Sequence, residues 1–358
     1  MRNIVCIGGS TGALDPIQRI VRRLPADLPA AVFLVRHISS DSSGLLANIL
    51  QPDSALPVID GVDGAPIQAG RITIAPPNAH LILDRTQVRL VNGPKENWAR
   101  PAIDPLFRTA AQHHGPRVIG IIVSGQLDDG AAGLWAIKRR GGFAAVQDPK
   151  DASAGDMPRY AITAAEVDVV ADADEIGSLL PEWCRRTTAF AVSQLVEKTA
   201  VSGKPRLEGT KPSPALLDEL GHPAGVVCPE CGGQLWQMKD GPLRYRCHVG
   251  HAQSARTLLA QQKQVVENAG WQVIRALEED DQLCLQMMGQ EKLPAVEKEL
   301  LASRLRKNRE QLERIRPLVV APPPKPSKHV ESVRMQAGSK PGNGDGPLIR
   351  SELGRFQD

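Results

Sequence analysis

The sequence has almost no excess of charge of either sign. Its 43 lysines and arginines are balanced by 40 aspartates and glutamates, so the formal net charge is +3 over 358 residues. A field this weak does not favour nucleic acid or an anionic membrane surface as a partner. No apolar run approaches the roughly 18 residues that span a bilayer, and the N-terminus has no cleavable signal pattern. We therefore expect a cytoplasmic protein that reaches a membrane at most peripherally, through a partner.

The glycine spacing of a dinucleotide-binding turn is also missing. Gly8, Gly9 and Gly12 follow the first apolar run, but they do not form GxGxxG. No acidic residue ends the second predicted strand, where the ribose of a dinucleotide would bind. These two absences disfavour a nucleotide-binding oxidoreductase or transferase.

The chain divides into segments of different composition. Up to about residue 190, short β-branched runs alternate with amphipathic helical stretches, which predicts an α/β domain with a doubly wound, mostly parallel sheet. The predicted strands are Ile4–Ile7, Ala31–Val35, Arg71–Ala75, Leu81–Leu83, Val118–Val123, Ala144–Val146 and Asp168–Val170. The rest is predicted to comprise a linker (191–224), a small zinc-ribbon-like module (225–253), a helical hairpin (254–317) and a disordered tail (318–358).

Ser10 lies in a glycine-rich turn between the first predicted strand and a helix. The heptapeptide Ile7-Gly8-Gly9-Ser10-Thr11-Gly12-Ala13 contains GxSxG, in which glycines permit a sharp turn and the close approach of a substrate carbonyl. The same pattern is also compatible with a phosphate-binding turn. A serine nucleophile therefore needs a base and an orienting acid before hydrolysis becomes the better interpretation.

Two further strand ends supply those partners. His37 follows the second predicted strand, and neighbouring strands lie about 4.8 Å apart, so it can reach Ser10 at the same sheet edge. His80, His113 and His114 have no such placement, and we interpret them as surface or capping residues. Asp129 follows the strand Val118–Val123 and is the candidate acid, with Asp128 as its rival. Either aspartate could instead cap a helix.

The motifs taken together resemble the catalytic domain of the CheB-type chemotaxis protein-glutamate methylesterases. They are IGGSTGAL, VRHISSDSSGLLANIL, IAPPNAHL, NWARPAIDPLF, VSGQLDDGAAGL and GDMPRYAI, within about residues 3 to 185. The resemblance implies a triad of Ser10, His37 and Asp129 and hydrolysis of γ-glutamyl methyl esters on methyl-accepting chemotaxis receptors, which releases methanol. Glutamine deamidation is implied as a related activity, and catalysis is expected to need no cofactor.

The resemblance also suggests backbone amides for the oxyanion. By analogy these belong to Thr11 and Gln126. The sequence departs from the family where TGMG is replaced by Ser124-Gly125-Gln126-Leu127, and where Ile38 replaces methionine after the base. The chain begins at the catalytic domain, so we expect no control by a receiver domain in cis. A catalytically weak scaffold or interaction protein is the alternative function.

Three of the six cysteines lie within twenty positions, which favours metal ligation over a disulfide framework. Cys228 and Cys231 form CxxC, and Cys247 is followed by two histidines. We predict a closed structural Zn²⁺ site made by Cys228, Cys231, Cys247 and His251, with His251 preferred over His248 because Gly250 lets the turn return to the metal. The hairpin that follows carries apolar stripes and is a candidate surface for self-association.

Overall fold

The computed structural model describes residues 2–39, 42, 44–186, 211–290 and 293–319. They belong to two compact units, Met1–Val266 and Glu267–Asp358. The first unit contains the predicted α/β domain and the cysteine-containing segment. The second contains most of the helical hairpin.

A parallel seven-stranded sheet forms the centre of the first unit, with the strand order β3-β4-β2-β1-β7-β8-β9. The central strand β1 (Ile4–Gly9) pairs with β2 (Ala31–Arg36) on one side and β7 (Val118–Ile122) on the other. The outer strands are β3 (Val58–Asp60), β4 (Arg71–Ile74), β8 (Phe143–Gln147) and β9 (Val169–Ala171). Because the strand order reverses at β1, the carboxyl ends of β1, β2 and β7 meet at the edge where open α/β sheets place their sites.

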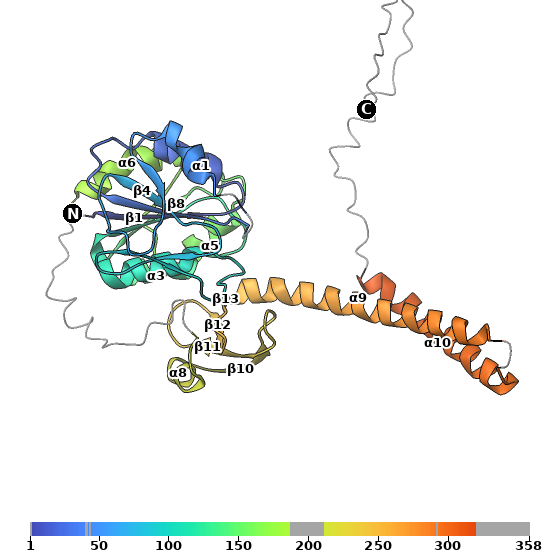
Figure 1. Ribbon diagram of the computed structural model, residues 1–358. Coiled ribbons are helices and arrows are strands. Elements are labelled where there is room, and N and C mark those ends of the chain that lie inside the picture. The colour runs from blue at the N-terminus through green and yellow to red at the C-terminus, as the bar shows by residue number, and fades with distance from the viewer. Residues whose placement is uncertain (1, 40–41, 43, 187–210, 291–292, 320–358) are drawn as a thin grey trace, which may run out of the picture. The chain divides into compact units, whose positions relative to one another are not determined.

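Helices cover both faces of this sheet (Figure 1). On one face α1 (Leu14–Arg22) and α6 (Ala173–Arg185) pack with Val5 and Ile7 of β1. On the other, α3 (Ile103–His114), α4 (Ala131–Arg139) and α5 (Asp156–Ala164) pack with Ile4 and Cys6. A strand that is buried on both faces needs apolar residues at successive positions, and Ile4–Ile7 is such a run. The predicted doubly wound α/β fold is therefore confirmed.

The sequence reading of the strands was wrong in two places. The strand β3 was missed, because only three residues pair with β4 and no periodicity marks so short a run. The predicted strand Leu81–Leu83 does exist, as β5 (His80–Leu83), but it pairs antiparallel with the unforeseen β6 (Val88–Val91) in a separate two-stranded hairpin. The short helix α2 (Leu46–Leu50) ends in a 3₁₀ turn, Gln51–Asp53, and a second such turn, Gly115–Arg117, precedes β7.

The segment 214–254, called the cysteine module below, is larger than the sequence predicted. It contains α8 (Pro214–Leu220) and a four-stranded antiparallel sheet, whose strands are β10 (Gly221–Val227), β11 (Gln234–Met238), β12 (Arg244–Cys247) and β13 (Ala252–Ser254). The predicted linker boundary at 224 was therefore wrong: Ser213 caps α8 and β10 pairs with β11, two features that composition does not reveal. Residues 191–210 of the predicted linker lie outside the described residues.

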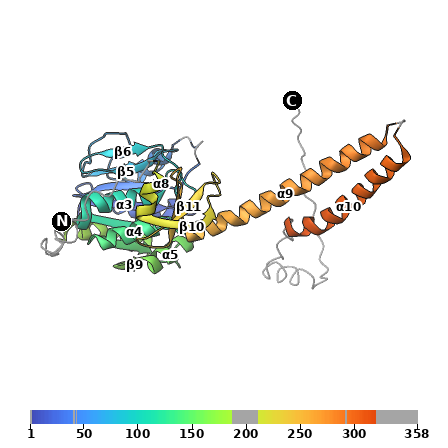
Figure 2. The same cartoon turned by 90° about the horizontal axis from the view of Figure 1, so that it is seen from below.

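The second unit is a helical hairpin. The helix α9 (Ala255–Met288) begins in the first unit and continues into the second, where α10 (Ala295–Val319) runs back alongside it (Figure 2). Arg304 binds Asp280 through two hydrogen bonds, and Asn308 donates to Asp280 and Asp281. The predicted tail lies outside the described residues from 320 onward. Among the described helices, none combines the length and apolar character that crossing a membrane requires.

Candidate active site and metal cluster

Ser10 lies in the turn between β1 and α1. The turn is closed by the Ala13 N–H, which donates to the Ser10 carbonyl at 3.1 Å, and it requires a left-handed residue at Gly12, where φ is +71°. A Cβ on Gly12 would also lie 2.7 Å from the Ser153 Cβ, so glycine is needed for space as well as for conformation. The Ser10 side chain is partly exposed at the carboxyl end of β1, as the sequence predicted.

His37 is held beside this turn by the register of the sheet. Its N–H donates to the Gly9 carbonyl at 3.1 Å, which continues the pairing of Gly9 with Arg36 by one residue and puts His37 next to Ser10. The His37 Nε2 lies 2.7 Å from the Asp129 Oδ2. That contact leaves Nδ1 as the nitrogen available to a serine. No hydrogen bond joins Ser10 to His37 among the described residues. Such bonds are often loose in a ligand-free site.

Asp129 is a buried carboxylate that accepts hydrogen bonds on both oxygens. Oδ2 accepts from His37 and from the Ile103 N–H at 2.6 Å, and Oδ1 accepts from the Asp104 and Gly130 N–H groups and from the Asn97 side chain. Two of these donors are the first amides of α3, whose own N-cap residue, Ala102, has no side-chain oxygen to offer. Asp129 thus caps α3 from another element while it contacts His37. The helix-capping interpretation therefore does not compete with the catalytic one.

These contacts set the ionisation of the acidic pair behind His37. Burial opposes the charge on Asp129, but the hydrogen bonds from His37, Ile103 and Asn97 outweigh it and hold the pKa of this carboxyl below its usual value. Burial and the charge of Asp129 raise the pKa of the neighbouring Asp104 to about 7. The geometry thus keeps the charge on the carboxylate that contacts the imidazole.

Asn97 is a site residue that the sequence analysis did not single out. Its amide nitrogen lies 2.8 Å from the Asp129 Oδ1 and 3.1 Å from the Asp104 Oδ2, so its two hydrogens serve two acids. The residue is buried and left-handed, with φ +48°. Its only sequence signal was membership of the segment NWARPAIDPLF, because an asparagine in a loop has no periodicity to mark it.

The rival acid Asp128 points to other partners. Its Oδ1 accepts from the Ser254 Oγ at 2.6 Å and, at 3.4 Å, from the Thr257 Oγ1. Burial raises the pKa of Asp128, and the hydrogen bond from Ser254 opposes that shift. Of the two adjacent aspartates, only Asp129 contacts His37 among the described residues.

The two suggested oxyanion donors belong to neighbouring loops. The Ser10 N–H donates to the Ser124 carbonyl at 2.9 Å, and the Ser124 Oγ donates to the Thr11 carbonyl at 2.8 Å. Within the described chain, the backbone amides of Thr11 and Gln126 donate to no other backbone group. Leu127 is left-handed, with φ +59°. The family's glycine at this position would carry that conformation without strain.

The histidines set aside by the sequence analysis are not all on the surface. His80 is buried, where its Nε2 contacts the Pro94 carbonyl at 3.0 Å and its Nδ1 accepts from the Ala102 N–H. His114 is also buried, and its Nε2 lies 3.0 Å from the Asp84 carbonyl. The surface alternative was therefore wrong for both: His80 begins β5 and His114 ends α3, and each ring is buried. Neither contacts His37 or Ser10 among the described residues.

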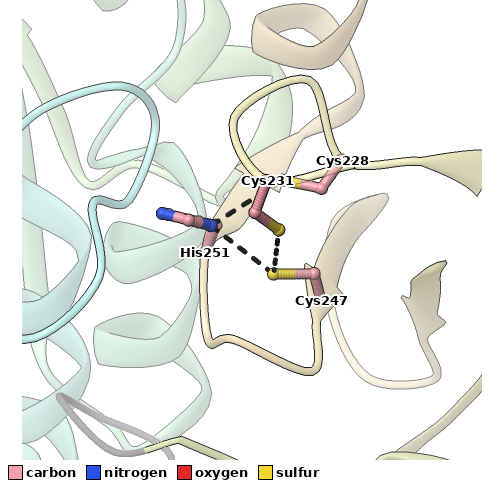
Figure 3. A group of neighbouring side chains, drawn as sticks. All are labelled: Cys228, Cys231, Cys247 and His251. Atoms are coloured by element: carbon pink, nitrogen blue, oxygen red, sulfur yellow. Dashed lines mark hydrogen bonds between the residues drawn. The ribbon is translucent and has the colours of Figure 1, made fainter. Parts of the chain in front are cut away.

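The cysteine module gathers four potential metal ligands, Cys228, Cys231, Cys247 and His251, whose ligand atoms all lie within 4.8 Å of one another (Figure 3). A tetrahedral Zn²⁺ with bonds of about 2.3 Å to sulfur and about 2.05 Å to nitrogen implies edges of about 3.8 Å and about 3.6 Å. The Cys231 and Cys247 sulfurs are 3.6 Å apart, and the His251 Nδ1 lies 3.8 Å from Cys228 and 3.6 Å from Cys247. The donor types therefore suit zinc, and these three ligand-atom distances match the edges of its tetrahedron.

Two electrostatic features surround the cluster. The other ring nitrogen of His251 lies 3.6 Å from the Glu230 carboxylate, which is an ion-pair distance and longer than a hydrogen bond. A hydrogen bond with Cys228 lowers the pKa of the Cys247 thiol to about 3 and raises the pKa of Cys228, while burial raises the pKa of Cys231. Of the three thiols, only Cys247 is therefore favoured as the thiolate. His248 is outside the four-ligand group, and its ring lies against the backbone of Gly233.

Comparison with known proteins agrees with the fold of the first unit. The family described as CheB methylesterase matches residues 5–180. A protein-glutamate methylesterase/protein-glutamine glutaminase 2 from Anaeromyxobacter dehalogenans is 37% identical over 182 residues, which cover 51% of this chain and 53% of the relative. A putative protein of the same name from Leptospira interrogans is 35% identical over 176 residues, which cover 49% of this chain and 91% of the relative.

A solved structure shows the same likeness. The CheB methylesterase catalytic domain of Thermotoga maritima is 31% identical, with a TM-score of 0.50, and the match covers 51% of this chain and 98% of that one. The chain spans about half the length of the Anaeromyxobacter relative.

Proposed function

Because the chain belongs to the CheB methylesterase family, we propose that it hydrolyses γ-glutamyl methyl esters on methylated chemotaxis-type receptors, with deamidation of glutamine as a related activity. The observation that carries the proposal is the 2.7 Å contact between His37 and the buried Asp129, at the sheet edge where Ser10 directly follows the neighbouring strand β1. The catalytic portion of the chain is a carboxylic-ester hydrolase by family.

In the proposed mechanism His37 removes the Ser10 proton as Oγ attacks the ester carbonyl. Asp129 orients the imidazole and stabilises its protonated form. The C–O bond to the methoxy group then breaks, and methanol leaves with the proton from His37. Water attacks the acyl-enzyme by the same route and releases the glutamate carboxylate and Ser10. In deamidation, ammonia would leave in place of methanol.

The developing oxyanion needs fixed N–H donors, each contributing about 3 to 4 kcal/mol to the transition state. The amides of Thr11 and Gln126 are our candidates, since the loops that carry them are joined by the Ser10–Ser124 and Ser124–Thr11 hydrogen bonds. A backbone donor does not depend on the side chain, so glutamine in place of methionine at 126 preserves this role.

The test is methanol release from membranes that contain methylated receptors, together with labelling by a fluorophosphonate. We expect Ser10→Ala to lower turnover by about 10⁴-fold or more and to abolish labelling. Ser178→Ala is the matched control, because the hydroxyl of this exposed serine donates to the Asp174 carbonyl within α6. Unchanged methanol release by the Ser10 variant would exclude the triad. Unlabelled wild-type protein would favour a catalytically inactive scaffold.

We also propose that Cys228, Cys231, Cys247 and His251 hold one structural Zn²⁺ per chain. All four positions are filled by protein, so no coordination site is left for a substrate. Elemental analysis of the purified protein should find about one zinc, which Cys231→Ser removes and His248→Ala retains. A wild-type protein purified under reducing conditions without zinc would end this part of the proposal.

Self-association through the hairpin remains part of the proposal. Large apolar side chains are exposed on the second unit, among them Val296, Leu300 and Leu318. If they pair with a second copy, light scattering should report a dimer that Leu300→Glu dissociates. A monomeric wild-type chain at high concentration would contradict this role.

A further inference from the structure

We propose that the cysteine module is a positioning element for the catalytic acid: its metal-held turn fixes Asn97, and Asn97 fixes Asp129. This inference rests on the proposed function, because it assigns a purpose to the same triad. It makes Asn97 a positioning residue and makes esterase activity depend on the metal in a module that contributes no residue to the proposed triad.

The cysteine module has a small apolar core. It consists of Cys228, Leu235 and Cys247 with Leu258 of α9, and a few partly buried neighbours. A segment of about forty residues with so small a core usually needs a metal or disulfides to stay folded. Two of the four core residues are themselves metal-ligand candidates. Loss of the metal would therefore release the turn 247–251 and the strands that flank it.

Those flanking strands contact the loop that carries Asn97. Immediately after His251, the Ala252 carbonyl accepts from the Asn97 N–H at 2.8 Å, and the Ser254 N–H donates to the Asn97 Oδ1 at 2.9 Å. Glu96 and Ala252 also form a parallel β-bridge. The loop is thus paired to β13, three residues or fewer from a metal ligand.

A buried ion pair strengthens this junction on the other side of the turn. Arg246, next to Cys247, lies 2.9 Å from a carboxylate oxygen of Glu96, and both side chains are 5% exposed. Arg108 of α3 binds the same carboxylate at 2.7 Å. Burial opposes the charge on Glu96, but the two arginines outweigh it and hold the pKa of this carboxyl far below its usual range. Removing Arg246 from this site would leave a buried charge with one partner fewer.

Asn97 connects this junction to Asp129, the proposed catalytic acid. Its Oδ1 accepts from the cysteine module, and its amide nitrogen donates to Asp129 and Asp104. Every hydrogen-bonding group of the side chain is therefore used, and the orientation of the amide is fixed by chemistry. If the Ser254 N–H withdraws, the amide is free to rotate and Asp129 loses a directed donor.

A second connection runs in parallel. The Ser254 Oγ accepts from the Thr257 N–H at 3.0 Å, where it caps α9, and donates to Asp128 at 2.6 Å. Asp128 precedes the acid in the chain. The same residue of β13 thus holds both the neighbour of Asp129 and, through Asn97, the carboxylate itself.

The junction is polar and incompletely filled. A cavity of about 370 Å³ lies there, lined by Asn97, Asp128, Ser254 and other residues of both parts. A tightly packed apolar interface would transmit any change into the core, whereas hydrogen bonds beside a cavity can be broken individually. Variants at this junction should therefore alter the acid without unfolding the α/β domain.

The first arm of the test removes the amide from Asn97. Asn97→Gly suits a backbone with φ +48° and deletes only the side chain, and Asn78→Gly is its matched control, because Asn78 is an exposed asparagine with φ +59°. With methanol release as the assay, we expect Asn97→Gly to lower kcat about 10- to 100-fold with KM unchanged, as for a lost hydrogen bond to a buried charge. Asn78→Gly should stay within about threefold of wild type.

The second arm removes the metal. Cys231→Ser, or chelation checked by elemental analysis, should lower kcat by a similar factor, whereas His248→Ala should not. The decisive measurement combines both changes: in the Asn97→Gly background, metal removal should lower kcat clearly less than it does in wild type, because only the connection through Asp128 is then left to transmit it. Multiplicative losses would overturn the inference, and so would full activity in metal-free wild-type protein.

Hydrogen exchange provides a readout that does not need activity. The Ile103 and Asp104 amides donate to Asp129, so we expect their hydrogen exchange to accelerate when the metal is removed from the wild-type protein. In the Asn97→Gly protein, metal removal should accelerate their exchange far less. Unchanged exchange in metal-free wild-type protein would refute the coupling even if the chain proved inactive. An inactive wild type with metal-dependent exchange would instead refute the proposed function and leave the coupling supported.

Discussion

Replacing Asp129 with asparagine tests the centre of the site. The substitution keeps the size of the side chain but exchanges one accepting oxygen for an amide that donates. Oδ1 receives three donors and Oδ2 receives two, so the new oxygen is expected at the Oδ1 position and the new amide at the Oδ2 position. The amide then faces His37 and the Ile103 N–H.

That arrangement changes the tautomer of His37. The Nε2 must accept from the new amide, so the proton moves to Nδ1, the nitrogen available to Ser10, and the imidazole can no longer act as a base. A wrong tautomer of this kind costs about 10⁴-fold in kcat. The Ile103 N–H loses its acceptor, which costs about 1–3 kcal/mol of folding free energy. Relief of the repulsion between Asp129 and Asp104 offsets part of that cost.

The assay is methanol release, with thermal unfolding measured on the same protein. Each kcal/mol should lower the Tm by about 2–4 °C for a domain of this size. Asp63→Asn is the matched control, because this half-exposed carboxylate pairs with Arg89 away from the triad. A folded Asp129→Asn protein with kcat within tenfold of wild type would refute the reasoning.

Three further predictions concern stability and pH. Leu127→Gly should raise the free energy of unfolding by up to about 1 kcal/mol, or leave it unchanged. Glycine relieves the strain of a φ of +59°, but its greater freedom in the unfolded chain opposes that gain. Denaturant unfolding measures the change in stability, and a clear loss would contradict backbone strain at Leu127. Asp104 has a pKa of about 7 in the folded protein against about 3.9 in the unfolded chain. Its contribution to stability is therefore full below about pH 4 and is lost as the pH rises towards 7, at a rate of at most about 1.4 kcal/mol per pH unit. Asp104→Asn should flatten that decline in urea titrations between pH 4 and 7.5, and an equally steep decline in the variant would argue against a protonated Asp104. Arg246→Met should destabilise the chain by about 3 kcal/mol or more by leaving Glu96 with one arginine, which chemical unfolding would detect, whereas replacing both partners should cost less.

The sequence by itself determined the α/β sheet and the chain positions of the candidate site. Apolar runs such as Ile4–Ile7 specify strands buried on both faces, and a residue placed directly after such a run must lie at the carboxyl edge of the sheet. Ser10, His37 and Asp129 could therefore be nominated without coordinates. CxxC followed by Cys247 and His251 nominated the metal cluster in the same way, since ligand spacing within a short segment is local information.

Tertiary structure decided what these residues contact. Nothing local distinguishes Asp129 from Asp128, yet one binds His37 and the other binds Ser254, because successive side chains leave the loop in different directions. The role of Asn97 arises from two partners, Asp129 and Ser254, that lie 32 and 157 positions away. Contacts over such separations depend on how whole elements pack, and no periodicity or composition in the chain encodes them.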